Sequence, residues 1–189
     1  MKDVLLVVAG LITIGSIIPY IMDIIRGKTK PNIVSWITWT LITGVATVAE
    51  IGGGEYRTAI FTGTAVLETL TVVILGIKYG HAHYTLFDVA CQVGALFGFV
   101  LWAIFNSPAA AVLFSVLIDF IGALPTVRHA WLRPHEETWV TFALAGVGGL
   151  LAIFALTNYN WTSLTYAVYI VLINIVFSFV IITRGKKLL

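Results

Sequence analysis

Apolar residues run along this chain in long, nearly unbroken stretches that short polar segments separate. A membrane-spanning helix needs about 20 mainly apolar residues. On that basis the pattern predicts seven helices, over 4–25, 33–52, 58–79, 85–105, 108–131, 138–157 and 162–183. The connecting segments are too short to hold a soluble domain, so we expect a single all-α bundle.

The composition agrees with an integral membrane protein. Of the 189 residues, 59% are hydrophobic and 11% are charged, against about 25% charged residues in soluble domains. A soluble core could not bury so much apolar surface, so we expect the lipid bilayer to cover it. The net charge of +2 gives no reason to expect nucleic acid as a partner. The single Cys91 allows no intramolecular disulfide.

Basic residues gather in alternate connecting segments. The segments after the first, third and fifth predicted helices, with the C-terminal end, hold Arg26, Lys28, Lys30, Lys78, Arg128, Arg133, Arg184, Lys186 and Lys187. The other segments hold only Arg57, and Lys2 stands at the N-terminus. Cytoplasmic loops carry the excess of Lys and Arg, so we expect the N-terminus outside and the C-terminus in the cytoplasm. The first apolar run continues to Ile25 without a small-residue cleavage site, which indicates a retained helix.

The first and last thirds of the chain repeat one another. The segment IIPYIMDIIRGKTKPNIVSWITW aligns with LPTVRHAWLRPHEETWVTF, and this alignment places Pro19 on Pro125. Further along, ETLTVVILGIKYG aligns with NIVFSFVIITRGK, which places Glu68 on Asn174. The first three predicted helices therefore correspond to the last three. Equivalent helices lie four apart in the chain, so the halves are parallel repeats with one helix between them.

This pattern predicts three structural units. The first bundle of three helices covers 1–80, a linker helix covers 81–107, and the second bundle of three helices covers 108–189. Each proline interrupts the hydrogen bonding of a predicted span and is a candidate hinge. The alternative for both prolines is a static kink, which membrane helices also tolerate.

A proline, a basic turn and a Ser-Trp or Thr-Trp pair occur in the same order in both repeats. This arrangement resembles the PQ-loop motif. The layout of three, one and three helices is similar to that of SWEET sugar transporters, lysosomal cystine and cationic amino-acid exporters and KDEL receptors. The resemblance covers nearly the whole chain, although Tyr20 and Thr126 stand where the motif has glutamine. The second and sixth predicted helices also lack the mid-helix prolines of SWEETs. The resemblance implies an outlying prokaryotic-type member in the plasma membrane, hinged at Pro19 and Pro125.

Aromatic residues occupy matched positions in the two repeats. Trp36 aligns with Trp139, and Trp39 aligns with Phe142. Helical spacing places Trp36 and Trp39 on one face of the second predicted helix, above threonines and Glu50. In SWEETs, aromatic residues of the second and sixth helices frame the substrate, which implies this role for all four. An interfacial tryptophan belt is the alternative, above all for Trp36.

Polar residues in the middle of predicted spans are the remaining candidates. Such residues are costly in lipid and mark functional sites by default. The resemblance implies a substrate-binding role for Glu68 and Asn174, and an interhelical hydrogen bond is the alternative. Asp119, with Glu68, is a candidate proton site, although Ser115 or a tyrosine side chain could instead hold Asp119 in place. Glu50 and Asp88 fall at helix ends, where we expect them to contact water.

These observations favour an alternating-access transporter of a small polar solute: a sugar, an amino acid or a cationic metabolite, with proton coupling as an option. No catalytic motif, metal-binding spacing or phosphate loop is present in the sequence, so we expect neither an enzyme nor a cofactor. Two alternatives share the fold, a passive channel and a ligand-binding membrane protein of the KDEL-receptor type. The latter would need inward-facing Arg or Lys. Self-association is left open.

Overall fold

The computed structural model describes residues 2–54, 56–105, 108–156 and 158–187. Within these ranges it contains α1 (Lys2–Ile25), α2 (Ile33–Gly52), α3 (Tyr56–Tyr79), α4 (Leu86–Ile104), α5 (Pro108–Leu132), the short 3-10 helix η1 (Pro134–Glu136), α6 (Trp139–Ala155) and α7 (Trp161–Lys187). The described part of the chain has no strand, which confirms the all-α prediction there. Positions 107 and 157, which end the predicted linker unit and the sixth predicted span, lie outside the described residues.

Most of these helices are long and apolar enough to cross a bilayer. Among the described residues, six meet this requirement of length and composition, and α6 is the exception. At 1.5 Å per residue, the 17 residues of α6 cover about 26 Å, against roughly 30 Å of hydrocarbon core. Large apolar side chains such as Leu67 and Leu172 are 65% and 56% exposed on the outer surface. Such a surface is suited to lipid; the seventh span stays a prediction.

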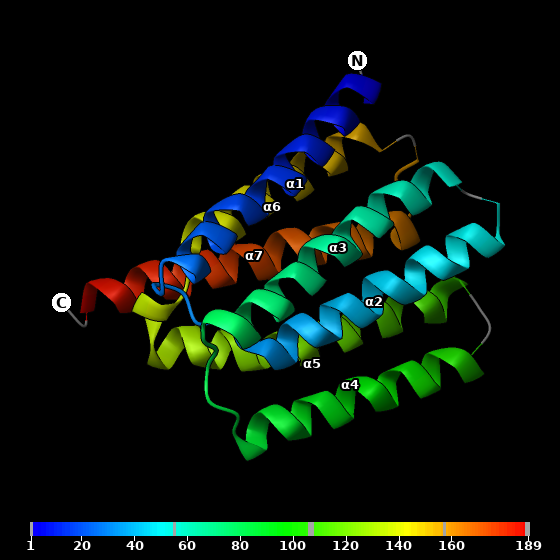
Figure 1. Ribbon diagram of the computed structural model, residues 1–189. Coiled ribbons are helices and arrows are strands. Elements are labelled where there is room, and N and C mark those ends of the chain that lie inside the picture. Colours follow the sequence, from blue (N-terminus) through cyan, green and yellow to red (C-terminus); the bar gives the residue numbers. More distant parts are fainter. Residues whose placement is uncertain (1, 55, 106–107, 157, 188–189) are drawn as a thin grey trace.

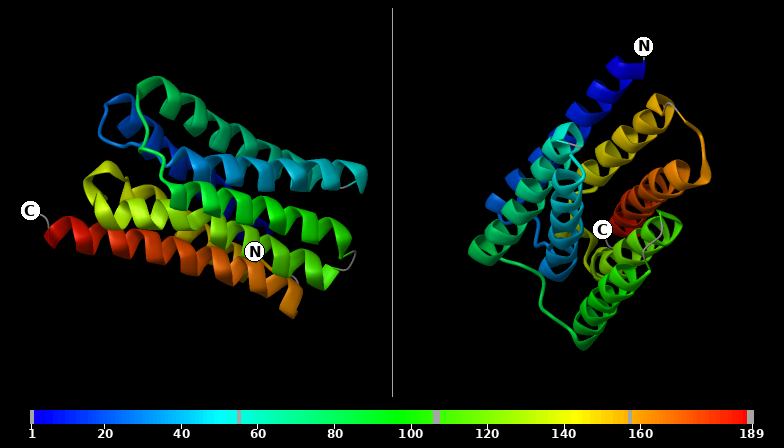
Figure 2. Two further views of the ribbon diagram at one scale, coloured as in Figure 1. Left: turned by 90° about the horizontal axis from the view of Figure 1, so that it is seen from below. Right: turned by 90° about the vertical axis from the view of Figure 1, so that its right-hand side faces the viewer.

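The helices pack as two groups of three that contact each other, and α4 lies beside them. α3 contacts both α1 and α2, and α7 contacts both α5 and α6. α1 packs along α6, and α2 packs against α5. α4 lies at the edge of the bundle (Figure 1), where it contacts α5 and α2. The right-hand view of Figure 2 separates α1, α2 and α3 from α5, α6 and α7.

Glycine allows the two groups of helices to approach closely. A Cβ atom on Gly148 of α6 would overlap the Thr13 hydroxyl and lie 3.2 Å from the Ala9 carbonyl oxygen of α1. A Cβ atom on Gly122 of α5 would lie 2.5 Å from a methyl carbon of Thr38 in α2. Both crossings therefore require a residue without a side chain.

Alternating helix directions give the bundle two distinct ends. The α1–α2, α3–α4 and α5–α6 connections lie toward the left of Figure 1 with the C-terminus, and the N-terminus lies at the other end. The end that holds these three connections and the C-terminus carries the cluster of Lys and Arg residues. We call it the basic end.

Asp88 corrects one expectation from the sequence. It was expected to contact water at a helix end, but it is 1% exposed. Its Oδ2 atom accepts hydrogen bonds of 2.7 Å from the backbone and the hydroxyl of Thr85, which forms the capping box of α4. Its Oδ1 atom accepts a bond of 3.2 Å from Asn32, the N-cap of α2. Helix capping at two helix starts therefore buries this carboxylate.

Candidate binding cavity

A cavity of about 220 Å³ lies between α1, α2 and α3 on one side and α5, α6 and α7 on the other. We call it the central cavity. Its polar lining consists of Thr13, Ser16, Thr43, Glu68, Thr69, Asp119, Thr141, Tyr166 and Asn174. Its apolar lining includes Trp36, Trp39, Phe142 and Phe177. Convergent polar groups between apolar and aromatic walls are typical of ligand sites.

Most residues that the sequence singled out converge on this cavity. Trp36, Trp39, Phe142, Glu68, Asn174 and Asp119 all line it. Trp139 does not: it begins α6 and is 45% exposed. Pro19 and Pro125 lie within α1 and α5, outside the lining. The structure places these six lining residues at one site. Their roles stay predictions.

Aromatic rings close the side of the cavity that faces the basic end. Trp36 and Trp39 make an edge-to-face pair with ring centroids 4.9 Å apart, and Phe142 stacks on Phe177 at 4.4 Å. Tyr20 packs against Trp36 at 4.9 Å. Such ring pairs are favourable beyond the area they bury. We call these five residues the aromatic floor.

Two carboxylates of the cavity have different surroundings. Asp119 is 6% exposed, and its Oδ2 atom accepts a hydrogen bond of 2.5 Å from the Tyr169 hydroxyl. Glu68 has a buried Oε1 atom for which the structure records no hydrogen-bond partner. The bond from Tyr169 is one of the contacts considered from the sequence, and the role of Asp119 stays a prediction. The Glu68 side chain lines the cavity, but its Oε1 atom itself is covered by protein.

Asn174 is anchored by its own helix. Its side-chain nitrogen donates a bond of 2.8 Å to the Ile170 carbonyl oxygen, one turn earlier in α7. This bond fixes the orientation of the amide at the cavity wall. A residue held in this way can present a defined polar group to a ligand without a rotamer search.

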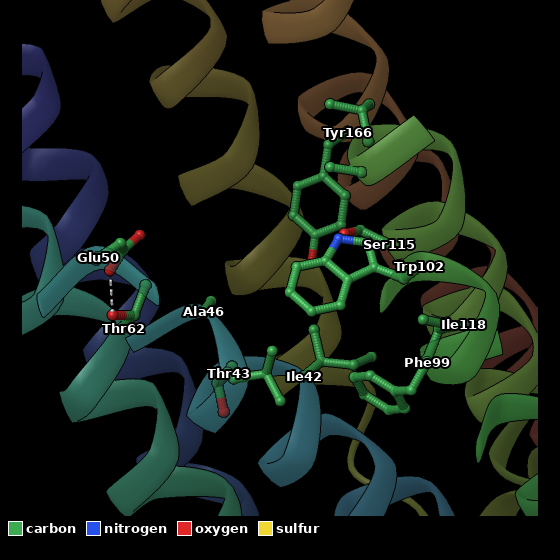
Figure 3. A pocket seen from close by; sticks show the side chains of 13 residues that line it. Ile42, Thr43, Ala46, Glu50, Thr62, Phe99, Trp102, Ser115, Ile118 and Tyr166 are labelled. Atoms are coloured by element: carbon green, nitrogen blue, oxygen red, sulfur yellow. Dashed lines mark hydrogen bonds between the residues drawn. The ribbon is translucent and has the colours of Figure 1, made fainter. Parts of the chain in front are cut away.

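A second, larger pocket of about 420 Å³ borders the central cavity on the side away from the basic end. We call it the outer pocket. It shares Ile42, Thr43 and Tyr166 with the central cavity. Figure 3 shows Trp102, Ser115 and Tyr166 on one side of it and Glu50 on the other. The Thr62 hydroxyl donates a bond of 2.6 Å to Glu50.

The basic end is closed by hydrogen bonds between the two groups of helices. The Tyr20 hydroxyl of α1 donates a bond of 2.9 Å to Oε2 of Glu137, before α6. Trp36 donates through its indole nitrogen to the Tyr20 oxygen at 3.3 Å. Tyr20 is 0% and Glu137 is 7% exposed. Sequence reasoning missed this pair; the signal was the tyrosine that replaces the expected glutamine.

Three further contacts reinforce this closure. The hydroxyl groups of Thr29 and Thr138 lie 2.6 Å apart, and Thr138 also donates to Asp23 at 3.0 Å. Lys30 forms an ion pair of 2.7 Å with Glu136. Burial alone would raise the pKa of Glu136, but the hydrogen bond and charge of Lys30 hold it below its ordinary value, with help from nearby cations. We refer to these contacts, with the Tyr20–Glu137 bond, as the basic-end closure.

Thermal stability is expected to fall as pH rises from about 5 to about 8 because of Glu137. Burial raises the pKa of this carboxyl from 4.5 to about 8, despite the hydrogen bond from Tyr20. Between these values the folded protein keeps a proton that the unfolded chain releases, so a rising pH favours unfolding. Glu137→Gln should flatten the slope of the melting temperature against pH in this window.

Asp3→Asn is the control for this measurement, because it makes the same kind of change at an exposed position on α1. Glu136 is unsuitable, since its charge helps to raise the pKa of Glu137. Wild-type and Glu137→Gln curves that run parallel from about pH 5 to 8 would contradict the assignment.

Comparison of the chain with protein-family models, curated proteins and solved structures finds no significant match.

Proposed function

We propose that this chain is an alternating-access membrane transporter of a small polar solute and not an enzyme. The observation that carries this proposal is the central cavity, which is walled by both groups of helices and blocked toward the basic end by the aromatic floor and the basic-end closure. A transporter needs a site near mid-membrane that faces one side at a time.

Residues 1–80 and 108–189 are, in this proposal, the two parallel repeats, and 81–107 is the linker. Two hydrogen bonds support this assignment. Ser35 accepts a bond of 3.2 Å from the backbone of Thr126, the residue after Pro125. Thr138, its equivalent in the repeat, bonds to Asp23, one turn after Pro19. The equivalent residues Ser35 and Thr138 thus each contact the proline-bearing helix of the other repeat, Ser35 directly after the proline and Thr138 one turn after it.

The basic end is the cytoplasmic end in this proposal, in keeping with the positive-inside rule. The arrangement is then the outward-facing one, with the outer pocket as the approach to the central cavity. The two repeats rock about Pro19 and Pro125, separate the contacts of the basic-end closure and open the cavity to the cytoplasm. Membership of the PQ-loop and SWEET-like superfamily is part of the same proposal.

Each residue of the central cavity has a role in this mechanism. Trp39 and Phe142 pack against the apolar or flat part of the solute, with Trp36 below them. Glu68 and Asn174 bind its polar part. Asp119 takes up and releases a proton during the transport cycle, because a carboxylate at mid-membrane is costly to leave ionised.

A thermal-shift screen of the purified protein tests the proposal. Sugars, amino acids, amines and nucleosides are added at about pH 5.5 and 7.5, and a ligand at a hundred times its Kd stabilises the native state by about 2.7 kcal/mol. The shift should be lost in Asn174→Ala and retained in Asn158→Ala, since Asn158 is exposed outside the cavity. Equal shifts in both variants would place the site elsewhere, and no shift with any solute would remove the support for a solute site.

A further inference from the structure

The charge along the proposed route has one sign. Glu50 lines the outer pocket, and Glu68 and Asp119 line the central cavity. Among the described residues that line either space, there is no Lys, Arg or His. A path lined by one sign of charge between low-dielectric walls concentrates ions of the opposite sign. The route therefore attracts cations and repels anions.

The groups at the cavity differ in what they leave available. Asp119 already accepts a hydrogen bond of 2.5 Å from Tyr169, whereas the buried Oε1 atom of Glu68 has no recorded partner. A buried acceptor without a partner costs free energy. A positively charged solute in the cavity would offset part of this cost by neutralising the Glu68 carboxylate at the cavity wall.

The aromatic rings that line the central cavity supply the second half of a cation site, above all the partly buried Trp39. Trp36 and Trp39, which meet edge to face, line the cavity with Phe142 and Phe177. Aromatic faces attract ammonium groups, and cages of such rings are used to bind quaternary ammonium ligands. An inorganic cation would instead need a shell of oxygen ligands. The cavity offers hydroxyl, amide and carboxylate oxygens, so sodium and potassium are the competing occupants that the test must include.

We propose that the solute of the central cavity is a small organic monocation without a carboxylate, such as a primary amine or a quaternary ammonium compound. This inference rests on the proposed transport function and names its substrate class. An amino acid would bring its carboxylate beside Glu68 and Asp119 with no basic residue to pair with it. A sugar would leave the carboxylate charge uncompensated. The volume of about 220 Å³ is suited to a small solute, because sites for drug-sized ligands start at about 300 Å³.

A matched set of probes tests charge separately from shape. Choline is compared with 3,3-dimethylbutan-1-ol, which has the same shape and no charge, and with glycine betaine, which adds a carboxylate. Tetramethylammonium, ethanolamine and glucose complete the set. Affinities are measured by calorimetry on the full chain in nanodiscs. We expect at least one amine to bind about tenfold or more tightly than its uncharged or zwitterionic counterpart, as a desolvated cation on aromatic faces should.

Two variants locate the binding. Glu68→Gln should weaken binding of the amine about tenfold or more, because it removes the charge and keeps the shape. Asp3→Asn, the same kind of change at an exposed position on α1, should leave the affinity unchanged. If Glu68→Gln fails to fold, the comparison of choline with its uncharged counterpart on the wild-type protein decides alone.

The outcomes separate this inference from the transport proposal. Binding of glucose or betaine in preference to every amine, lost in Asn174→Ala, would overturn the monocation and leave the transporter intact. Saturable binding of sodium or potassium that excludes the amines would also overturn it. Absence of binding by any solute in the wider screen would remove both proposals.

Discussion

Oxidation of a Thr29→Cys/Thr138→Cys protein is expected to reduce solute transport about tenfold or more without abolishing solute binding. The two hydroxyl oxygens lie 2.6 Å apart, which brings the side chains close enough for a disulfide, whose Cβ atoms are about 3.8 Å apart. The bond would join the α1–α2 connection to the residue that precedes α6 and hold the basic end closed. The central cavity would still be reached through the outer pocket.

Counterflow of the solute identified by the screen, in liposomes, measures this effect. Cys91 is buried and is replaced by alanine in every variant, so that only the introduced pair can react. Each single-cysteine protein, oxidised in the same way, is the control, and a reducing agent should restore transport. A cross-linked protein that transports at the uncross-linked rate would show that the basic end does not open. A cross-linked protein that neither binds nor transports would place the entrance at the basic end.

Asp119→Asn is expected to lose accumulation driven by a pH gradient, by about tenfold or more, and to retain solute binding. Asparagine has the shape of aspartate and keeps an oxygen that can accept the bond from Tyr169, but it cannot release a proton. Coupling should therefore fail while the wall of the cavity is preserved. The measurement compares uptake into liposomes with and without an imposed pH gradient.

Tyr169→Phe is the matched control for this change, because it removes the hydrogen bond of 2.5 Å and keeps the carboxylate. It should retain the response to the gradient. Wild-type uptake that ignores the gradient would exclude proton coupling altogether. A response that persists in Asp119→Asn would instead assign the proton to Glu68, the other carboxylate of the cavity.

Sequence pattern was sufficient for the helices and for most of the candidate site. The bilayer requires long apolar runs, and such runs can be located in a sequence without knowledge of tertiary contacts. α2, for example, begins and ends at the predicted residues 33 and 52. Glu68, Asp119 and Asn174 were found because polar groups in apolar spans must face the interior of the bundle. Trp39 and Phe142 were found by helical spacing together with the repeat.

Contacts between segments that are far apart in the chain could not be predicted from the sequence. Trp139 matches Trp36 in the repeat, yet Trp36 is 4% exposed and Trp139 is 45% exposed. Equivalent positions in the two repeats need not be equally buried, because burial depends on which neighbouring helix covers each side chain. The bond from Tyr20 to Glu137 joins residues 117 apart, and no local pattern pairs them. Asp88 was misplaced for the same reason, since its partner Asn32 belongs to the start of another helix.

The shortness of α6 has a consequence for the surrounding lipid. A hydrophobic segment about 4 Å shorter than the hydrocarbon core makes nearby acyl chains compress, at a fraction of a kcal/mol per Å of mismatch. α6 packs along α1, where the two groups of helices meet. Any change in the tilt of α6 against α1 therefore changes the local thickness mismatch. In the proposed transport cycle, acyl-chain length would therefore act on the balance between the outward-facing and inward-facing arrangements.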